Sequence, residues 1–109
     1  MIAHVVLFRP RADLTEAERD GVVAAFETAI REIPSVRRAR VGRRILHGRP
    51  YEGLMKEDFP YAAILEFDDL AGLAAYLEHP AHEQLANRFF AVLNGALVYD
   101  FDLKEDGSY

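Results

Sequence analysis

The sequence alternates between short runs suited to strands and longer runs suited to helices, and this order constrains the fold most. Residues 2–9, IAHVVLFR, are rich in β-branched and aromatic side chains and too short for a typical helix, so they predict a strand. The same reasoning predicts three further strands, over residues 36–46, 61–69 and 96–103.

Helical sequence follows the first and the third of these strands. Apolar residues recur at helical spacing over residues 15–34, where Thr15 and Glu18 have the spacing of a capping box. A second helical region covers residues 70–79 and resumes over 80–93, with a proline at the break. The order β-α-β-β-α-β predicts the ferredoxin-like α+β fold, an antiparallel four-stranded sheet with helices on one face.

The face of this sheet without helices is predicted to be apolar as well. Residues 2–9 carry apolar side chains on both faces, and residues 96–103 place Tyr99 and Phe101 on one face and Val98 on the other. Because an apolar sheet face needs a cover, we expect it to pack on a second copy in a two-fold homodimer. Residues 1–103 are expected to form one domain, and residues 104–109 a polar tail.

The composition excludes several classes of protein. A net charge of −5 and a pI near 5.3 argue against a nucleic-acid or anionic-membrane surface, since both need clustered positive charge. The chain has no cysteine, which excludes disulfides, thiolate nucleophiles and cysteine zinc sites. No signal peptide and no apolar stretch near the roughly 20 residues of a membrane span is present. We therefore expect a soluble, cytoplasmic protein.

The segment YLEHPAHEQL, residues 76–85, is the strongest candidate for chemistry. A proline suits the first position of a helix, which places His79 at the N-cap and His82 in the first turn. The positive end of the helix dipole disfavours imidazolium, so His82 is expected to be neutral near pH 7. A neutral imidazole accepts protons as a general base. Tyr76 lies on the other arm of the break, where its phenol could polarise a carbonyl oxygen.

Two other interpretations of these histidines stand beside the catalytic one. Histidines at helix starts are often caps or satisfied surface groups, and Tyr76 has the helical spacing of a core residue. A metal site is disfavoured, because zinc needs three or four ligands of defined geometry and no HExxH motif or carboxylate cluster accompanies His79 and His82. No metal is expected.

Three stretches of the sequence resemble a known family: HVVLF near the start, LEFDDLAGLAAYLEHPAH after the long loop, and YDFDL near the end. They are similar to the stress-responsive dimeric α/β-barrel family, called Dabb. The resemblance implies a ferredoxin-like subunit and a homodimer whose sheets form a barrel. A plant polyketide cyclase of this family performs an aldol closure with a tyrosine and a histidine that match Tyr76 and His82, while His4 and His79 match two further histidines. Residues 47–60 depart from the family, so the substrate does not carry over.

Further residues are candidates for binding a ligand. His4 and Phe8 share one face of the first strand; a lone histidine there is more often a satisfied core residue, but the resemblance raises its chance of lining a pocket. Loops of more than about 12 residues are often lids or binding elements, so His47, Tyr51 and Tyr61 are predicted to help wall the pocket. A floppy hairpin connection is the alternative. Leu54, Met55 and Phe59 belong to the same segment.

Five arginines crowd residues 37–44. A basic strand could bind phosphates, coenzyme A or RNA, but the third strand lacks the glycine-aromatic run of an RNA-recognition sheet. A charged edge strand, protected against unwanted pairing, is the favoured interpretation. Ion pairs to acidic helices or to a partner subunit are expected.

Two functions remain open at this point. In the first, an apolar pocket between sheet and helices holds a small carbonyl compound for cofactor-free acid/base chemistry of the aldol or cyclase type. His82 would be the base, Tyr76 the donor, and His4 and His79 would orient them. In the second, the protein is a non-catalytic dimer that binds a ligand under stress. Cofactor-independent oxygenase chemistry is a weaker third possibility.

Overall fold

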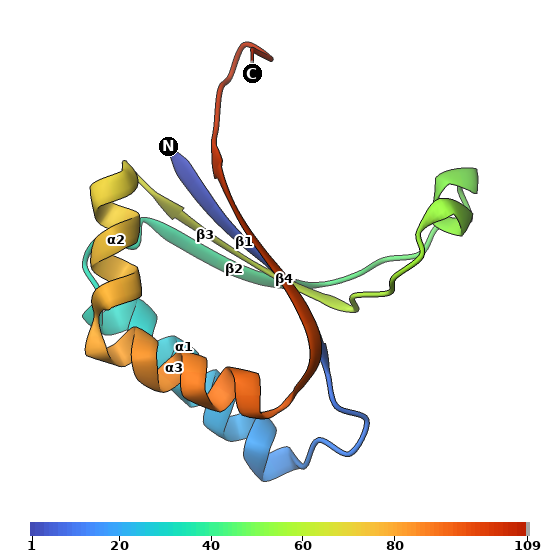
Figure 1. Cartoon of the computed structure of the whole chain (residues 1–109), viewed down its shortest axis with the longest axis horizontal. Helices are drawn as coiled ribbons and strands as arrows, with labels where there is room; N and C mark the ends of the chain where they lie inside the picture. The colour runs from blue at the N-terminus through green and yellow to red at the C-terminus, as the bar shows by residue number, and fades with distance from the viewer. Residues whose placement is uncertain (109) are drawn as a thin grey trace.

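The structure is a computed structural model, and it describes residues 1–108. Its elements are β1 (Ile2–Pro10), α1 (Glu16–Glu32), β2 (Arg38–Arg43), the 3-10 helix η1 (Pro50–Leu54), β3 (Tyr61–Phe67), α2 (Leu70–Glu78), α3 (Pro80–Ala91) and β4 (Leu93–Asp102). The strands form one antiparallel sheet in the order β2-β3-β1-β4. The three α-helices cover one face of it (Figure 1). The predicted ferredoxin-like α+β fold is confirmed.

The strand ends differ from the predicted ones. β2 is shorter than predicted. The backbone N–H groups of Arg37 and Arg44, on either side of it, still donate to the carbonyls of Glu66 in β3 and of Pro60 just before β3. β4 begins at Leu93, three residues earlier than predicted, and α3 correspondingly ends at Ala91. A register shift between Arg9 and Pro10 allows β1 to pair with the start of β4. Such irregularities depend on pairing between strands that are distant in the chain, which local sequence patterns do not predict.

The core lies between the sheet and the helices. Phe67, Leu65 and Ile33 are its largest fully buried side chains. Leu65 and Phe67 are two positions apart on β3, so both lie on the face toward the helices. Ile33 is the C-cap residue of α1. These residues pack with Leu73 and Tyr76 of α2 and Leu85 of α3, so burial of apolar surface between the layers is the main stabilising force.

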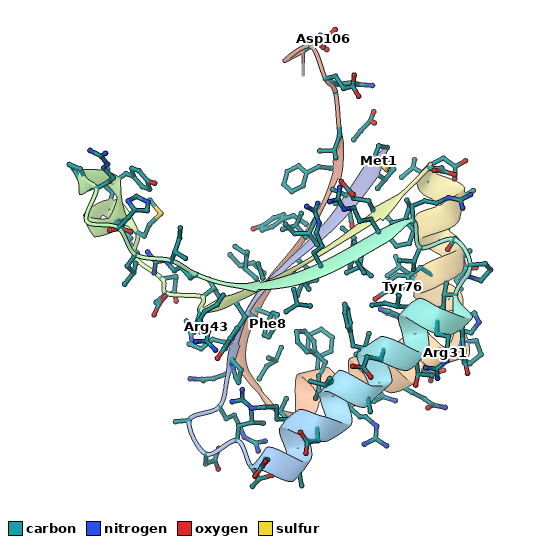
Figure 2. All side chains as sticks on the ribbon, turned by 180° about the vertical axis from the view of Figure 1, so that it is seen from behind. Met1, Phe8, Arg31, Arg43, Tyr76 and Asp106 are labelled. Atoms are coloured by element: carbon teal, nitrogen blue, oxygen red, sulfur yellow. The ribbon has the colours of Figure 1, made fainter. Side chains whose placement is uncertain are left out.

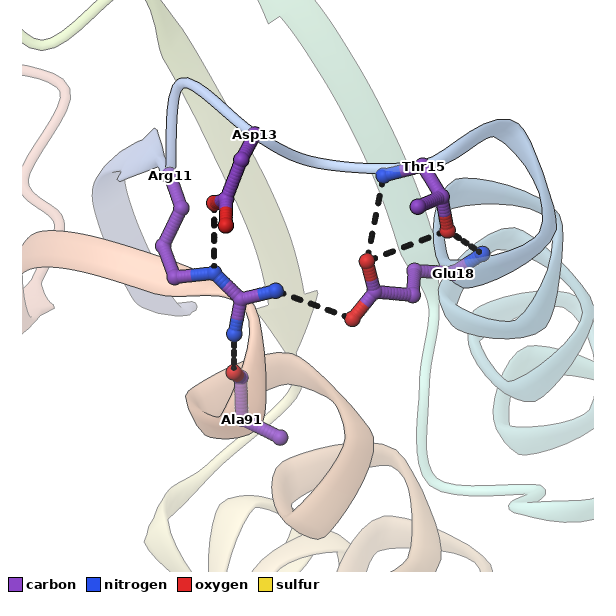
Figure 3. A network of polar contacts seen from close by, with 5 residues as sticks. All are labelled: Arg11, Asp13, Thr15, Glu18 and Ala91. Atoms are coloured by element: carbon purple, nitrogen blue, oxygen red, sulfur yellow. Dashed lines mark hydrogen bonds and ion pairs between the residues drawn. The ribbon is translucent and has the colours of Figure 1, made fainter.

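A polar network closes the end of the molecule where α1 begins (Figure 3). The predicted capping box is present: the Thr15 hydroxyl accepts from the Glu18 N–H at 3.1 Å, and the Glu18 carboxylate accepts from the Thr15 N–H at 3.1 Å. Arg11 donates to Glu18 at 2.9 Å and to the Ala91 carbonyl. The bonds from Thr15, followed by that from Arg11, lower the pKa of Glu18. The network fastens the loop after β1 to the end of α3.

Replacing Thr15 with alanine is expected to destabilise the protein by about 1 kcal/mol, because the Glu18 N–H loses its cap acceptor. Urea unfolding followed by circular dichroism measures this change. Thr28→Ala, inside the same helix, is the control and should shift the midpoint far less. Equal shifts for both variants would mean that the capping bond contributes nothing.

The arginine-rich strand β2 is an edge strand, as predicted. Arg40 of the strand lies 3.8 Å from Glu66 of β3. The arginines on either side of the strand pair with loop residues: Arg37 with Asp68 at 2.9 Å, and Arg44 with Asp58 at 2.6 Å. The expected pairing with acidic helices is not found in residues 1–108, because β2 and its partners lie along the sheet rather than under the helices. Exposed pairs of this kind contribute little stability.

The helix-free face of the sheet is open and is apolar over β1 and β4, while Arg38 and Arg40 of β2 and Glu66 of β3 lie on the same face. Tyr99 and Phe101 of β4 are exposed on it, as are Leu97 and Leu103. Figures 1 and 2 show the segment between β2 and β3 and the C-terminal segment both rising on this side of the sheet. Of the predicted polar tail, residues 104–108 lie beyond the last strand with an exposed turn, and Tyr109 lies outside the described residues.

Candidate functional site

A cavity of about 650 Å³ lies between the sheet and the helices. Its walls are almost entirely apolar: Val6, Phe8 and Ala63 contribute from the sheet, while Phe26 of α1 and Phe89 of α3 contribute from the helices. Figure 2 shows Phe8 on the sheet and Tyr76 on the helices across the space between the layers. Volume and lining are typical of a site for a small apolar molecule.

Three polar rings gather at one part of this cavity. Tyr76 of α2 packs edge-on to His82 of α3, with ring centroids 4.6 Å apart, and to His4 of β1, at 5.8 Å. The break between α2 and α3 at Pro80 is what folds the two helices so that Tyr76 and His82 meet. Tyr76 is 3% exposed and His4 is 6% exposed. The rings of Tyr76 and His82 thus lie side by side across the helix break, and their predicted roles stay predictions.

His82 is half-buried, and burial lowers the pKa of its imidazole, with the nearby His4 adding to the effect. The direction agrees with the predicted neutral ring, but the causes are burial and His4, whereas the prediction rested on the helix dipole. A backbone hydrogen bond to the Leu77 carbonyl acts in the opposite sense. A neutral imidazole carries a hydrogen on one ring nitrogen, and its other nitrogen is free to accept a proton.

Burial acts on Tyr76 in the opposite direction. Desolvation raises the pKa of its phenol to about 12, because the ionised form is disfavoured away from water. Tyr76 therefore stays protonated at neutral pH and serves as a hydrogen-bond donor. The pair thus combines a neutral base with a neutral donor, which suits proton transfer beside a carbonyl group.

His4 is held by a residue that sequence reasoning missed, Asp100. The Nδ1 atom of His4 lies 2.6 Å from Oδ1 of Asp100, its direct partner in the β1–β4 register. A carboxylate only accepts hydrogen bonds, so Nδ1 carries the hydrogen. In the neutral ring, Nε2 is then the nitrogen that can accept a hydrogen bond. The alternation of side chains along the last strand places Asp100 on the same face as Val98, and this is visible in the sequence. The pairing register that sets Asp100 opposite His4 is not.

His79 has a structural role. Its Nδ1 accepts from the Ala81 N–H at 3.0 Å, so it is the N-cap of α3, as the helix-start pattern predicted. It is not among the residues that line the cavity. The capping interpretation therefore accounts for His79, and the predicted binding role has no geometric support.

The other predicted binding residues separate into two groups. Phe8 and Tyr61 line the cavity and stack with ring centroids 5.5 Å apart. His47 and Tyr51 instead bond each other, with Nε2 and Oη 2.7 Å apart, in a segment that projects away from the helices (Figure 1). They do not line the cavity, because the chain leaves β2 on the helix-free side of the sheet.

Neither metal-ligand clusters nor spanning helices are found in residues 1–108. No group of three or more histidine and carboxylate side chains is placed to hold a metal ion in this part of the chain. No helix there is long and apolar enough to cross a membrane.

The lowered pKa of His82 predicts a pH dependence of stability. Below the ordinary histidine pKa of 6.5 the unfolded chain takes up a proton at this position more readily than the folded chain, so acidification favours unfolding. The urea concentration at the unfolding midpoint should therefore decrease as the pH is lowered from about 7.5 to about 5.5. The decrease should be smaller for His82→Gln. Identical pH profiles for the two proteins would contradict a lowered pKa.

Comparisons with known proteins agree with the fold. No curated protein matches the sequence at a significant level. Among solved structures, a hydroxynitrile lyase from Passiflora edulis has a TM-score of 0.80 at 18% identity, covering 95% of this chain and 94% of its own. A variant of SnoaB, a cofactor-independent oxygenase from Streptomyces nogalater, has a TM-score of 0.69 at 18% identity, covering 95% and 93%.

A further neighbour is a dimeric ferredoxin-like protein of unknown function from Jannaschia sp. CCS1, with a TM-score of 0.72 at 26% identity, covering 94% of this chain and 98% of its own. The family model of the stress responsive A/B barrel domain, Dabb, matches residues 2–103. This match spans every strand and helix of the structure. The chain therefore belongs to the Dabb family.

Proposed function

We propose that the protein binds a small, mostly apolar carbonyl compound in the cavity and catalyses proton transfer beside its carbonyl group. One observation carries the proposal: the base His82 and the donor Tyr76 meet at the polar part of an otherwise apolar cavity. A neutral base with a lowered pKa and a protonated phenol are the two groups that enolate chemistry needs.

The proposed steps move one proton and one electron pair at a time. His82 takes a proton from the carbon next to the carbonyl, and the electron pair of the C–H bond becomes the enolate. Tyr76 donates a hydrogen bond to the oxygen on which the negative charge develops. The enolate carbon then bonds to a second carbonyl carbon of the same molecule, and the resulting alkoxide takes the proton back from His82. This is an aldol-type ring closure without a cofactor.

His4 is proposed to bind the substrate rather than to act as the base. Its bond to Asp100 orients the ring, and its Nε2 remains available as the second polar contact at the same part of the cavity. Phe8 and Tyr61 are proposed to hold the apolar part of the ligand.

Relatives of the same fold support chemistry on small molecules. One structural neighbour is named as a hydroxynitrile lyase and another as a cofactor-independent oxygenase. Proteins of this fold thus carry out more than one reaction, so the site residues, rather than the fold, support the aldol-type proposal.

We further propose that the working form is a homodimer joined through the helix-free face of the sheet. The exposed Tyr99 and Phe101 supply the aromatic surface that such an interface buries. Solved neighbours are described as dimeric ferredoxin-like proteins. Sedimentation at micromolar concentration tests this proposal, and a monomer there would contradict it.

Filling the cavity from the sheet side tests whether it is the binding site. Ala63 is buried and lines the cavity, so Ala63→Leu should weaken binding of 2-octanone, measured by calorimetry, about tenfold or more. Ala74→Leu, on the exposed side of α2, is the matched control and should bind normally. Equal affinities for both variants would place the ligand elsewhere. Binding without any turnover would instead support a non-catalytic binding protein.

A further inference from the structure

The segment between β2 and β3, residues 44–60, forms an arm that leaves the body of the protein. Large apolar side chains are exposed along it: Ile45, Leu46, Tyr51, Leu54 and Met55. Leu54, at 75% exposure, is among the most exposed of these. Among residues 1–108, the buried core includes no residue of the arm. A concentration of exposed apolar side chains of this kind marks an interaction site.

The arm is ordered by its own contacts. The Glu52 carboxylate accepts from the N–H groups of His47 at 2.9 Å and Gly48 at 2.8 Å. The phenol of Tyr51 bonds His47. The polar groups near the tip are thus satisfied within the arm, while its apolar side chains have no cover.

The base of the arm is fastened to the sheet. Arg44 pairs with Asp58 at 2.6 Å, and Arg9 donates to the Asp58 carbonyl at 2.9 Å. The guanidinium of Arg9 also lies 5.0 Å from the ring centre of Phe59. These contacts set the direction in which the arm leaves the sheet.

That direction is toward the helix-free side. In Figures 1 and 2 the arm and the C-terminal segment rise on the side opposite the helices and flank the open sheet face between them. Any body that packs on this face therefore also meets the arm. Tyr99 and Phe101 of β4 are exposed on this same face.

We propose that the arm clasps a second copy of this chain, burying Leu54 and Met55 against the partner subunit. The inference rests on the proposed sheet-to-sheet dimer and adds a second area of contact to it. Each subunit supplies one arm, since a two-fold interface uses the same surfaces twice. His47 and Tyr51 thus belong to this clasp rather than to the ligand pocket.

Single cysteines test the clasp, because the chain has no cysteine of its own. Leu54→Cys places a thiol on the arm, and Leu70→Cys places one at the start of α2, where the native side chain is 69% exposed. The rate of alkylation is measured at a concentration where sedimentation shows the dimer and again after dilution to the monomer. In the dimer the thiol of Leu54→Cys should react about tenfold more slowly than in the monomer, while that of Leu70→Cys should react equally in both.

The outcomes separate the clasp from the dimer itself. A dimer in which the arm thiol reacts as fast as in the monomer overturns the clasp and leaves the sheet interface standing. A wild-type protein that stays monomeric overturns both. Leu54→Ser with Met55→Ser provides an independent measurement: the clasp predicts a dimer dissociation constant raised about tenfold or more, with Leu70→Ser as control. An unchanged constant counts against the clasp.

Discussion

Replacing His82 with glutamine is expected to slow the protein-catalysed exchange of the protons beside the carbonyl of 2-octanone by about 10²–10⁴-fold. Glutamine keeps a polar side chain at the position but cannot accept the proton. Tyr76→Phe should slow the same exchange by about 10²–10³-fold, since the enolate oxygen loses its donor. Exchange in deuterated water, followed by proton NMR, measures both variants against the native protein.

His79→Gln is the matched control for the base. It changes a histidine three positions away that caps α3 and does not line the cavity. This variant should exchange the ketone at the native rate and lose about 1 kcal/mol of stability. If His82→Gln folds and exchanges at the native rate as well, His82 is not the base.

Replacing Phe67 with alanine is expected to cost about 3–5 kcal/mol of unfolding free energy. Its side chain is 0% exposed, and its ring centre lies 5.3 Å from that of Tyr76. The substitution removes buried apolar surface and leaves a cavity beside Tyr76. Because domains of this size are stable by only about 5–15 kcal/mol, urea unfolding should show a large shift of the midpoint.

Phe90→Ala is the control for this substitution. Its side chain is 60% exposed, so the same chemical change should cost less than about 1 kcal/mol. Similar losses for the two variants would show that the β3 side of the core does not hold the layers together.

The sequence predicted the fold well because its signals are local. The capping box of Thr15 and Glu18, the proline that starts α3 and the alternating apolar residues of the strands each act within a few positions. The ends of β4 and β2 were less well predicted. They depend on the pairing of Pro10 with Leu93 and on where β2 leaves β3, which are contacts between distant parts of the chain.

The candidate site shows the same division. Tyr76, His79 and His82 lie within seven positions, so the helix break alone brought the tyrosine to His82 and made His79 a cap. Asp100 is 96 residues from His4, and only the β1–β4 register joins them. The length of the loop after β2 predicted that His47 and Tyr51 help to line the pocket. Loop length does not indicate the side of the sheet to which a loop turns.

The position of a bound ketone tests the central claim most directly. A crystal structure with 2-octanone is predicted to show the ligand in the cavity, with its carbonyl oxygen about 3 Å from the Tyr76 hydroxyl and its neighbouring carbon facing the His82 ring. A ketone bound only outside the cavity, or inside it with the carbonyl turned away from Tyr76 and His82, would contradict the proposed chemistry.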